Sequence, residues 1–136
     1  MNKNHIFIDT NILVGAYSGK EADRQCLQYL FSLTGKKLFV SALSVSQFVS
    51  VMQKKHTNSQ IREWVKYFLL KFNIVSFQKD DIQKSLLYEN TDMEDNIQYV
   101  LGQKTKCFYF VTNNTKDYKF INIEALKPAS VRLIKR

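Results

Sequence analysis

Short apolar runs alternate with longer amphipathic segments along the chain, and this alternation limits the fold more than any other feature. A short apolar run bounded by polar residues is typical of a buried strand, and apolar residues spaced i, i+3, i+4 are typical of a helix. Strands separated by helices predict an α/β fold with a parallel sheet and right-handed crossovers. The expected strands are residues 5–8, 38–40, 72–75 and 107–111, with a short edge strand at 121–123.

The predicted helices have recognisable ends. Ser41 or Ser44 can cap the helix after the second strand, because a serine hydroxyl accepts a hydrogen bond from a free backbone N–H. Gly35 supplies a helix stop, and Pro128 suits the first turn of the last helix. The helices are expected at residues 11–17, 21–34, 41–55, 58–71, 80–89, 93–105 and 128–136.

Length and composition bound the domain count and the class of protein. With 136 residues, 45% of them hydrophobic, we expect one cored domain over residues 1–136. Cys26 and Cys107 form no Cys-x-x-Cys pair and are expected to be reduced core thiols. No apolar stretch approaches the roughly 18 residues of a membrane span, and the N-terminus lacks a signal-peptide pattern. These features predict a soluble, cytoplasmic protein.

The chain is basic, with 20 Lys and Arg against 12 Asp and Glu and a net charge of +8. This balance favours an anionic partner such as the phosphate backbone of a nucleic acid. The alternative is that the charge serves solubility alone, because the basic residues are scattered in small groups.

Acidic residues stand at three places that a parallel sheet can bring together. Asp9 follows the first strand, and Asp117 follows the fourth strand after a polar segment. Because the carboxyl ends of parallel strands share one edge, these two can converge. Asp92 and Asp95, at i and i+3, project from one side of a helix start. Clustered carboxylates repel one another unless a cation neutralises them, so the pattern favours a divalent metal facing a phosphodiester.

Each of these positions also has an ordinary structural interpretation. Asp9 can be the N-cap of the following helix. Thr91 and Glu94 fit a capping box, with Glu94 as a cap or a solvated side chain. Nucleophilic catalysis is not favoured, because His5 and His56 are expected to be structural or solvated and no serine or cysteine has a partner.

The segment from residue 112 to residue 118 is a polar loop by composition. In the functional interpretation, Thr112 and Asn113 hold the metal's water or a carboxylate. Lys116 and Lys119 would then meet the phosphates of the substrate.

Three segments resemble the signature motifs of PIN domains, in the family's order and spacing. This resemblance covers nearly the whole chain and implies a three-layer α/β/α sandwich around a central, mostly parallel sheet of four to five strands. It also implies a Mg²⁺- or Mn²⁺-dependent ribonuclease, most similar to the bacterial toxins of toxin–antitoxin pairs. The segments are FIDTNIL at residues 7–13, DMEDNIQY at 92–99 and VTNNTKDY at 111–118.

Carried over by position, the resemblance implies catalytic and metal-binding roles for Asp9, Asp95 and Asp117, with Asp92 as a further metal ligand. Many PIN nucleases place a Glu on the helix after the second strand, where Gln47 stands in this chain. An amide offers a metal only a carbonyl oxygen, or holds a water, so the cation should bind more weakly. The supporting residues are expected to be Asn11, Gln47, Thr112 and Asn113.

These features predict a metal-dependent endoribonuclease that acts on RNA as the toxin of a toxin–antitoxin pair. A homodimer and a cognate antitoxin are the expected protein partners. The alternative is a catalytically degenerate PIN module that binds RNA or a protein without cleavage. A DNA nuclease related to flap endonucleases is less favoured, because the chain has no helical arch. The apolar surface for partner contacts is expected from Tyr17, Phe48, Trp64, Tyr67 and Phe68.

Overall fold

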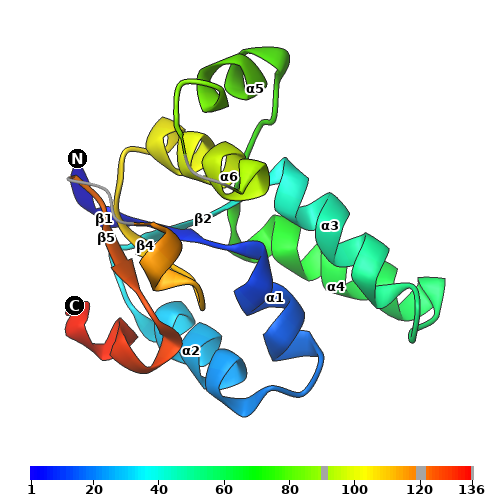
Figure 1. The fold of residues 1–136 in the computed structure, drawn as a ribbon. Helices are drawn as coiled ribbons and strands as arrows, with labels where there is room; N and C mark the ends of the chain where they lie inside the picture. The colour runs from blue at the N-terminus through cyan, green and yellow to red at the C-terminus, as the bar shows by residue number, and fades with distance from the viewer. Residues whose placement is uncertain (90–91, 119–121, 136) are drawn as a thin grey trace.

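A five-stranded parallel sheet runs through the computed structural model, which describes residues 1–89, 92–118 and 122–135 (Figure 1). The strands lie in the order β3-β2-β1-β4-β5, so the first strand of the chain is the central one. Phe7 of β1 is in register with Phe39 of β2 on one side and with Phe110 of β4 on the other. The strands are β1 Asn2–Ile8, β2 Lys37–Ser41, β3 Asn73–Val75, β4 Cys107–Val111 and β5 Glu124–Leu126.

Helices cover both faces of the sheet, as the predicted α/β/α sandwich requires. Successive residues of a strand point to opposite faces. Ile6 and Ile8 therefore pack with the helices α1 to α4 in one core cluster, whereas Phe7 packs with α6 in a second. In Figure 1, α6 lies on the upper side of the sheet and α2 on the lower side. The helices are α1 Thr10–Tyr17, α2 Glu21–Ser32, α3 Ala42–Met52, α4 Asn58–Lys71, α5 Lys79–Ser85 and α6 Met93–Lys104, with 3-10 helices η1 Thr115–Asp117 and η2 Pro128–Leu133.

The C-terminal elements differ most from the prediction. The edge strand is β5 and not residues 121–123, of which Ile121 lies outside the described residues. The edge strand lies at these later residues because they are the ones that pair with β4, with Tyr109 opposite Glu124. The last segment starts at Pro128 as expected, but it forms a 3-10 helix. Among the described helices, none has the length and apolar character to cross a membrane.

Two of the five aromatic residues expected on the surface are core residues, whereas Tyr67 is exposed. Phe48 and Phe68 are fully buried, so the prediction is wrong for both. Their rings lie edge-to-face with a centroid distance of 4.8 Å, and Tyr17 packs on them at 5.5 and 5.3 Å. Trp64 is half-buried in the same cluster, 5.2 Å from Tyr17. The apolar faces of α3 and α4 are used to join these helices to α1.

Both cysteines are free, buried thiols. Burial raises the pKa of Cys26 to about 12, with a smaller effect of the charge on Asp23, and burial raises the pKa of Cys107 to about 11. Because the thiolate is the reactive form, neither thiol should react with DTNB in the folded protein at about pH 8. Both should react after unfolding in guanidinium chloride. Rapid labelling of the native protein would contradict this burial.

Candidate active site

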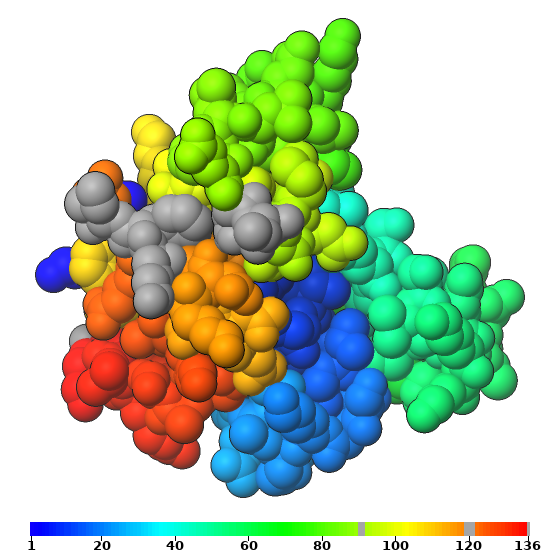
Figure 2. Space-filling view, viewed as in Figure 1, coloured from blue at the N-terminus to red at the C-terminus, as the bar shows by residue number. Residues whose placement is uncertain are grey.

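Acidic side chains from two elements line an open hollow of about 510 Å³ at the carboxyl edge of the sheet. Asp9 follows β1 directly, and Asp92, Glu94 and Asp95 come from the start of α6. In Figure 2, blue N-terminal residues lie between the yellow-green start of α6 and the orange segment after β4. The rest of the lining consists of Thr10, Asn11, Val14, Gln47, Ser50, Val51, Gln98 and Asn114.

Asp9 is both the N-cap of α1 and part of the hollow. Its Oδ1 accepts from the backbone N of Thr10 at 2.8 Å, and its Oδ2 accepts from the hydroxyl of buried Thr112 at 2.8 Å. Asn11 Nδ2 donates to the same Oδ2 at 3.3 Å. Asp9 is 5% exposed, and burial raises its pKa to about 6 against the lowering effect of these hydrogen bonds. The charge of Asp95 also raises this pKa. The structural and the functional interpretation of Asp9 are therefore compatible.

Asp92 is the N-cap of α6. Its Oδ1 accepts from the backbone N of Glu94 at 2.9 Å and from that of Asp95 at 3.2 Å. In the capping-box interpretation, Thr91 was expected to be the N-cap of this helix, but Thr91 lies outside the described residues. Glu94 instead lines the hollow together with Asp92.

Tyr118 connects the acids of the two elements. Its buried hydroxyl donates to Asp95 Oδ1 at 2.9 Å and also lowers the pKa of Asp9 by hydrogen bonding. Burial raises the pKa of half-buried Asp95, and the charges of Asp92, Asp117 and Glu94 raise it further. Burial and the two carboxylates likewise raise the pKa of the Tyr118 phenol. The carboxylates of Asp9 and Asp95 thus line one hollow, and the Tyr118 hydroxyl donates a hydrogen bond to Asp95.

Gln47 bridges α1 and α6 across the hollow. Its Oε1 accepts from the Thr10 hydroxyl at 2.8 Å, and its Nε2 donates to Glu94 Oε2 at 3.5 Å. The carbonyl oxygen, which is the atom of an amide that binds a metal, is therefore engaged by Thr10. The NH₂ group faces the acids and offsets part of their repulsion.

The segment after β4 brings some of its predicted site residues to the hollow and not others. Thr112 donates to the Asp9 carboxylate, as one of its two predicted roles requires. Asp117 is exposed in η1, and the described lining of the hollow includes Asn114 and not Asp117. The charge of Asp117 nevertheless reaches Asp95. Lys116 is exposed in the same turn, and Lys119 lies outside the described residues.

Several residues at or next to the site were missed by the sequence reasoning. Glu94 was assigned to the cap or to solvent, and Thr10 and Gln98 were not considered. Gln98 is buried, and its Nε2 lies 2.8 Å from the hydroxyls of both Thr10 and Ser44. Asn114 had one available signal, its place three residues after the end of a strand that leads to the carboxyl edge. Tyr118 had none, because its partners lie on other elements.

The donor set suits a hard divalent cation. Carboxylate and amide oxygens are the ligands of Mg²⁺ and Mn²⁺, and none of the described lining residues is His or Cys. Among the described residues, no three Asp, Glu, His or Cys side chains stand close enough to enclose an ion. Mg²⁺ usually keeps several waters and takes one or two carboxylates. Asp9 and Asp95 line the same hollow, and the charge of Asp95 raises the pKa of Asp9, so they offer such a pair.

Comparisons with known proteins agree with this architecture. Ribonuclease VapC1 of Aquifex aeolicus (strain VF5) is 28% identical over 140 residues, covering 93% of this chain and 92% of the relative. The structure of VapBC-1 from nontypeable Haemophilus influenzae aligns with a TM-score of 0.71 at 12% identity, covering 93% of this chain and 99% of that one. A toxin–antitoxin complex from Klebsiella pneumoniae aligns with a TM-score of 0.69 at 21% identity, covering 90% of this chain and 97% of that one. At these identities, the two structures show a shared fold.

The family model of the PIN domain matches residues 6–123. This range includes the four acidic residues of the hollow, the end of β1 and the whole of α6. The chain therefore belongs to the PIN domain family.

Proposed function

We propose that this protein is a metal-dependent endoribonuclease that hydrolyses RNA phosphodiesters in the cytoplasm as the toxin of a toxin–antitoxin pair. The observation that carries the proposal is that Asp9 and Asp95 line one hollow at the carboxyl edge of a PIN fold, close enough for the charge of Asp95 to raise the pKa of Asp9. The relative named Ribonuclease VapC1 supports the same class of function. A net charge of +8 suits an RNA substrate.

Asp9 and Asp95 are the proposed ligands of one Mg²⁺ or Mn²⁺ ion. Asp92 stands beside them, and Asp117 contributes charge from the neighbouring turn. When bound, such an ion supplies a water of lowered pKa and neutralises charge on the phosphate. The chain's own part is orientation, because Thr112 and the backbone of Thr10 fix Asp9. Tyr118 holds one oxygen of Asp95 and leaves the other for the ion.

Cationic side chains after β4 are the proposed contacts for the RNA backbone. Lys116 is exposed in η1, one residue before Asp117. Lys119, two residues after Asp117 in the sequence, is the second proposed contact.

A cognate antitoxin and a second copy of the chain are the proposed protein partners. The Klebsiella structure is a toxin–antitoxin complex, and this chain has apolar surface for such contacts. Tyr17 and Tyr67 line a hollow of about 330 Å³ with Leu27 and Phe31, which we assign to the antitoxin. Leu70, 84% exposed on α4, suits the contact between two copies.

A specific observation also favours a second candidate, a degenerate PIN module that binds RNA or a protein without cutting it. The amides of Gln47 and Asn114 line the hollow, and Gln47 donates to Glu94. A site with amides in place of acids attracts a cation less strongly. Such a module would still bind RNA in a salt-dependent manner.

Cleavage of RNA separates the two candidates. Purified protein incubated with tRNAs and structured RNAs should cut in Mg²⁺ or Mn²⁺ and not in EDTA. Asp9→Asn and Asp95→Asn should each slow cleavage about 100-fold or more, since even the partners of metal ligands are worth about 10- to 100-fold. Asp80→Asn is the matched control, because Asp80 is an exposed aspartate paired with Lys84 on α5. RNA binding without cutting, unchanged in Asp9→Asn, would support the binding module instead.

The ionisation of Asp9 should make the metal-free protein less stable as the pH rises. Its pKa is about 6 in the folded protein and 3.8 ordinarily, so between these values the folded state binds more protons than the unfolded state. The free energy of unfolding therefore falls as the pH rises, by at most about 3 kcal/mol from this group. Urea unfolding in EDTA at about pH 4.5 and pH 7.5 measures this effect. Between these two pH values the free energy of unfolding should fall more in the wild type than in Asp9→Asn. Equal losses would contradict the ionisation of a buried Asp9.

Gln47→Glu adds the carboxylate that many PIN nucleases carry at this position. Next to Glu94 it should lower the melting temperature in EDTA, because like charges repel without a cation. It should also raise Mn²⁺ affinity by on the order of 10-fold, since affinity follows the charge of the ligands. Thermal unfolding with and without Mn²⁺ measures both effects. Gln60→Glu, at an exposed position on α4, is the control. If Mn²⁺ raised the melting temperature of Gln47→Glu by no more than it raises that of the wild type, residue 47 would not be a metal ligand.

A further inference from the structure

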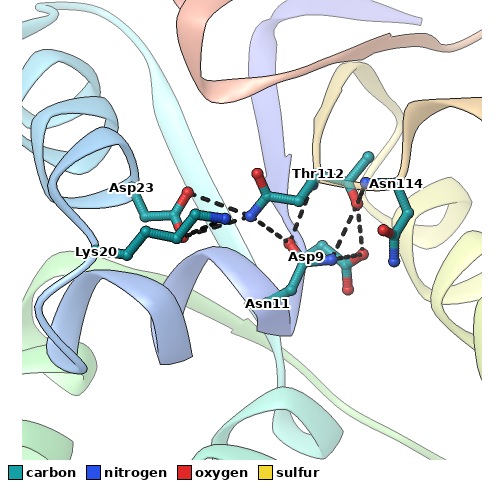
Figure 3. Close-up of polar contacts among 7 residues, drawn as sticks. Asp9, Asn11, Lys20, Asp23, Thr112 and Asn114 are labelled. Atoms are coloured by element: carbon teal, nitrogen blue, oxygen red, sulfur yellow. Dashed lines mark hydrogen bonds and ion pairs between the residues drawn. The ribbon is translucent and has the colours of Figure 1, made fainter.

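A chain of hydrogen bonds leads from a buried carboxylate on α2 to Asp9 (Figure 3). Asp23 is 0% exposed, and its two carboxylate oxygens accept from Asn113 Nδ2 at 3.2 and 3.4 Å. Asn113 donates to Asn11 Oδ1 through its backbone N at 3.1 Å and its side chain at 3.5 Å. Asn11 Nδ2 in turn donates to Asp9 Oδ2 at 3.3 Å. Two amide side chains thus separate Asp23 from the proposed metal ligand.

Asp23 anchors the far end of this chain. Its two carboxylate oxygens hold the NH₂ group of Asn113. The backbone N–H of Asn113, which can only donate, holds the carbonyl oxygen of Asn11. The NH₂ group of Asn11 is then left for Asp9 Oδ2 and for Thr112 Oγ1, both at 3.3 Å. Asp23 therefore acts by holding Asn113, the residue that orients Asn11.

The Asp23 carboxylate packs directly against Gly15 of α1. A Cβ atom at Gly15 would lie 1.7 Å from Asp23 Oδ2, so a larger residue in α1 would displace it. Lys20 Nζ lies 3.8 Å from the same oxygen. An apolar side chain would pack here without the cost of burying a charge. The carboxylate is stabilised here by Lys20, by Asn113 and by its place in the first turn of α2.

We propose that Asp23 is a positioning residue of the metal site. Through Asn113 and Asn11 it fixes the Asp9 carboxylate in the orientation that binds the cation. This inference rests on the proposed function, because it requires a metal ion at Asp9. Groups that hold a metal ligand in place typically change metal affinity about 10- to 100-fold.

Asp81 offers a matched control elsewhere in the molecule. It is 2% exposed, lies in the first turn of α5 and pairs with Lys104 at 2.9 Å. It is absent from the described lining of the hollow. Asp23→Asn and Asp81→Asn each remove a buried carboxylate paired with a lysine, so both should lower the free energy of unfolding in EDTA. Only the first should weaken Mn²⁺ binding.

The test is a Mn²⁺ titration of the full chain by electron paramagnetic resonance, with urea unfolding of each variant in parallel. The Kd should rise about 10-fold in Asp23→Asn and in Asn113→Ala and stay unchanged in Asp81→Asn. The double variant Asp23→Asn/Asn113→Ala should bind no more weakly than either single variant, because both changes break one chain of contacts. The inference would be overturned if the losses of Mn²⁺ affinity in the two single variants added up in the double variant. Equal Kd values in Asp23→Asn and Asp81→Asn would overturn it as well. Should Asp23→Asn not fold, an unchanged Kd in Asn113→Ala would overturn it, since Asn113 is only half-buried.

The same titration distinguishes this inference from the proposed function. If the wild type binds Mn²⁺ no more tightly than Asp9→Asn, the metal site fails and the role of Asp23 fails with it. If binding is lost in Asp9→Asn but equal in the Asp23 and Asp81 variants, only the role of Asp23 is overturned.

Discussion

The rest of the structure depends on how the central strand ends. The backbone N–H of Asp9 donates to the carbonyl oxygen of Val111 at 2.9 Å, so the pairing of β1 with β4 extends one residue beyond β1. The side chain then caps α1 and accepts from Thr112, which follows β4. One residue therefore ends a strand, starts a helix and joins the two central strands. Because it is also a buried carboxylate, this structural junction is where a cation would be most favourable.

Polar networks on either side of Asp9 connect this junction to the surrounding helices. On one side, Gln98 of α6 lies within hydrogen-bonding distance of Thr10 on α1 and Ser44 on α3. On the other side, Asn11 leads through the segment after β4 to α2. Hydrogen bonds are stronger in a low-dielectric interior, and fully satisfied networks restrict side chains to one arrangement. Donors within the protein therefore hold the acids of the hollow in place without a metal ion.

Local patterns predicted much of the fold and part of the site. The bounds of β4 and α4 were correct because each has a clear apolar pattern, whereas β5 was placed too early because pairing with β4 determines it. Asp9 and Asp117 were expected to converge at the carboxyl edge of the sheet, and Asp92 and Asp95 were expected to project from one side of a helix start. Asp9, Asp92 and Asp95 line the hollow, whereas its described lining does not include Asp117. Tyr118 and Asp23 were missed, because their partners are distant in the chain: 90 positions separate Asp23 from Asn113. Such contacts leave no periodic pattern, and a buried aspartate reads like any polar residue of a helix start.

A crystal of the protein grown or soaked with Mn²⁺ and measured at the manganese absorption edge tests the central claim most directly. We expect one anomalous peak in the hollow, about 2.1 Å from a carboxylate oxygen of Asp9 and from one of Asp95, with waters completing the coordination. An anomalous map with no peak there, or with its peak at acids outside the hollow, would contradict a metal-dependent active site at the end of the central strand.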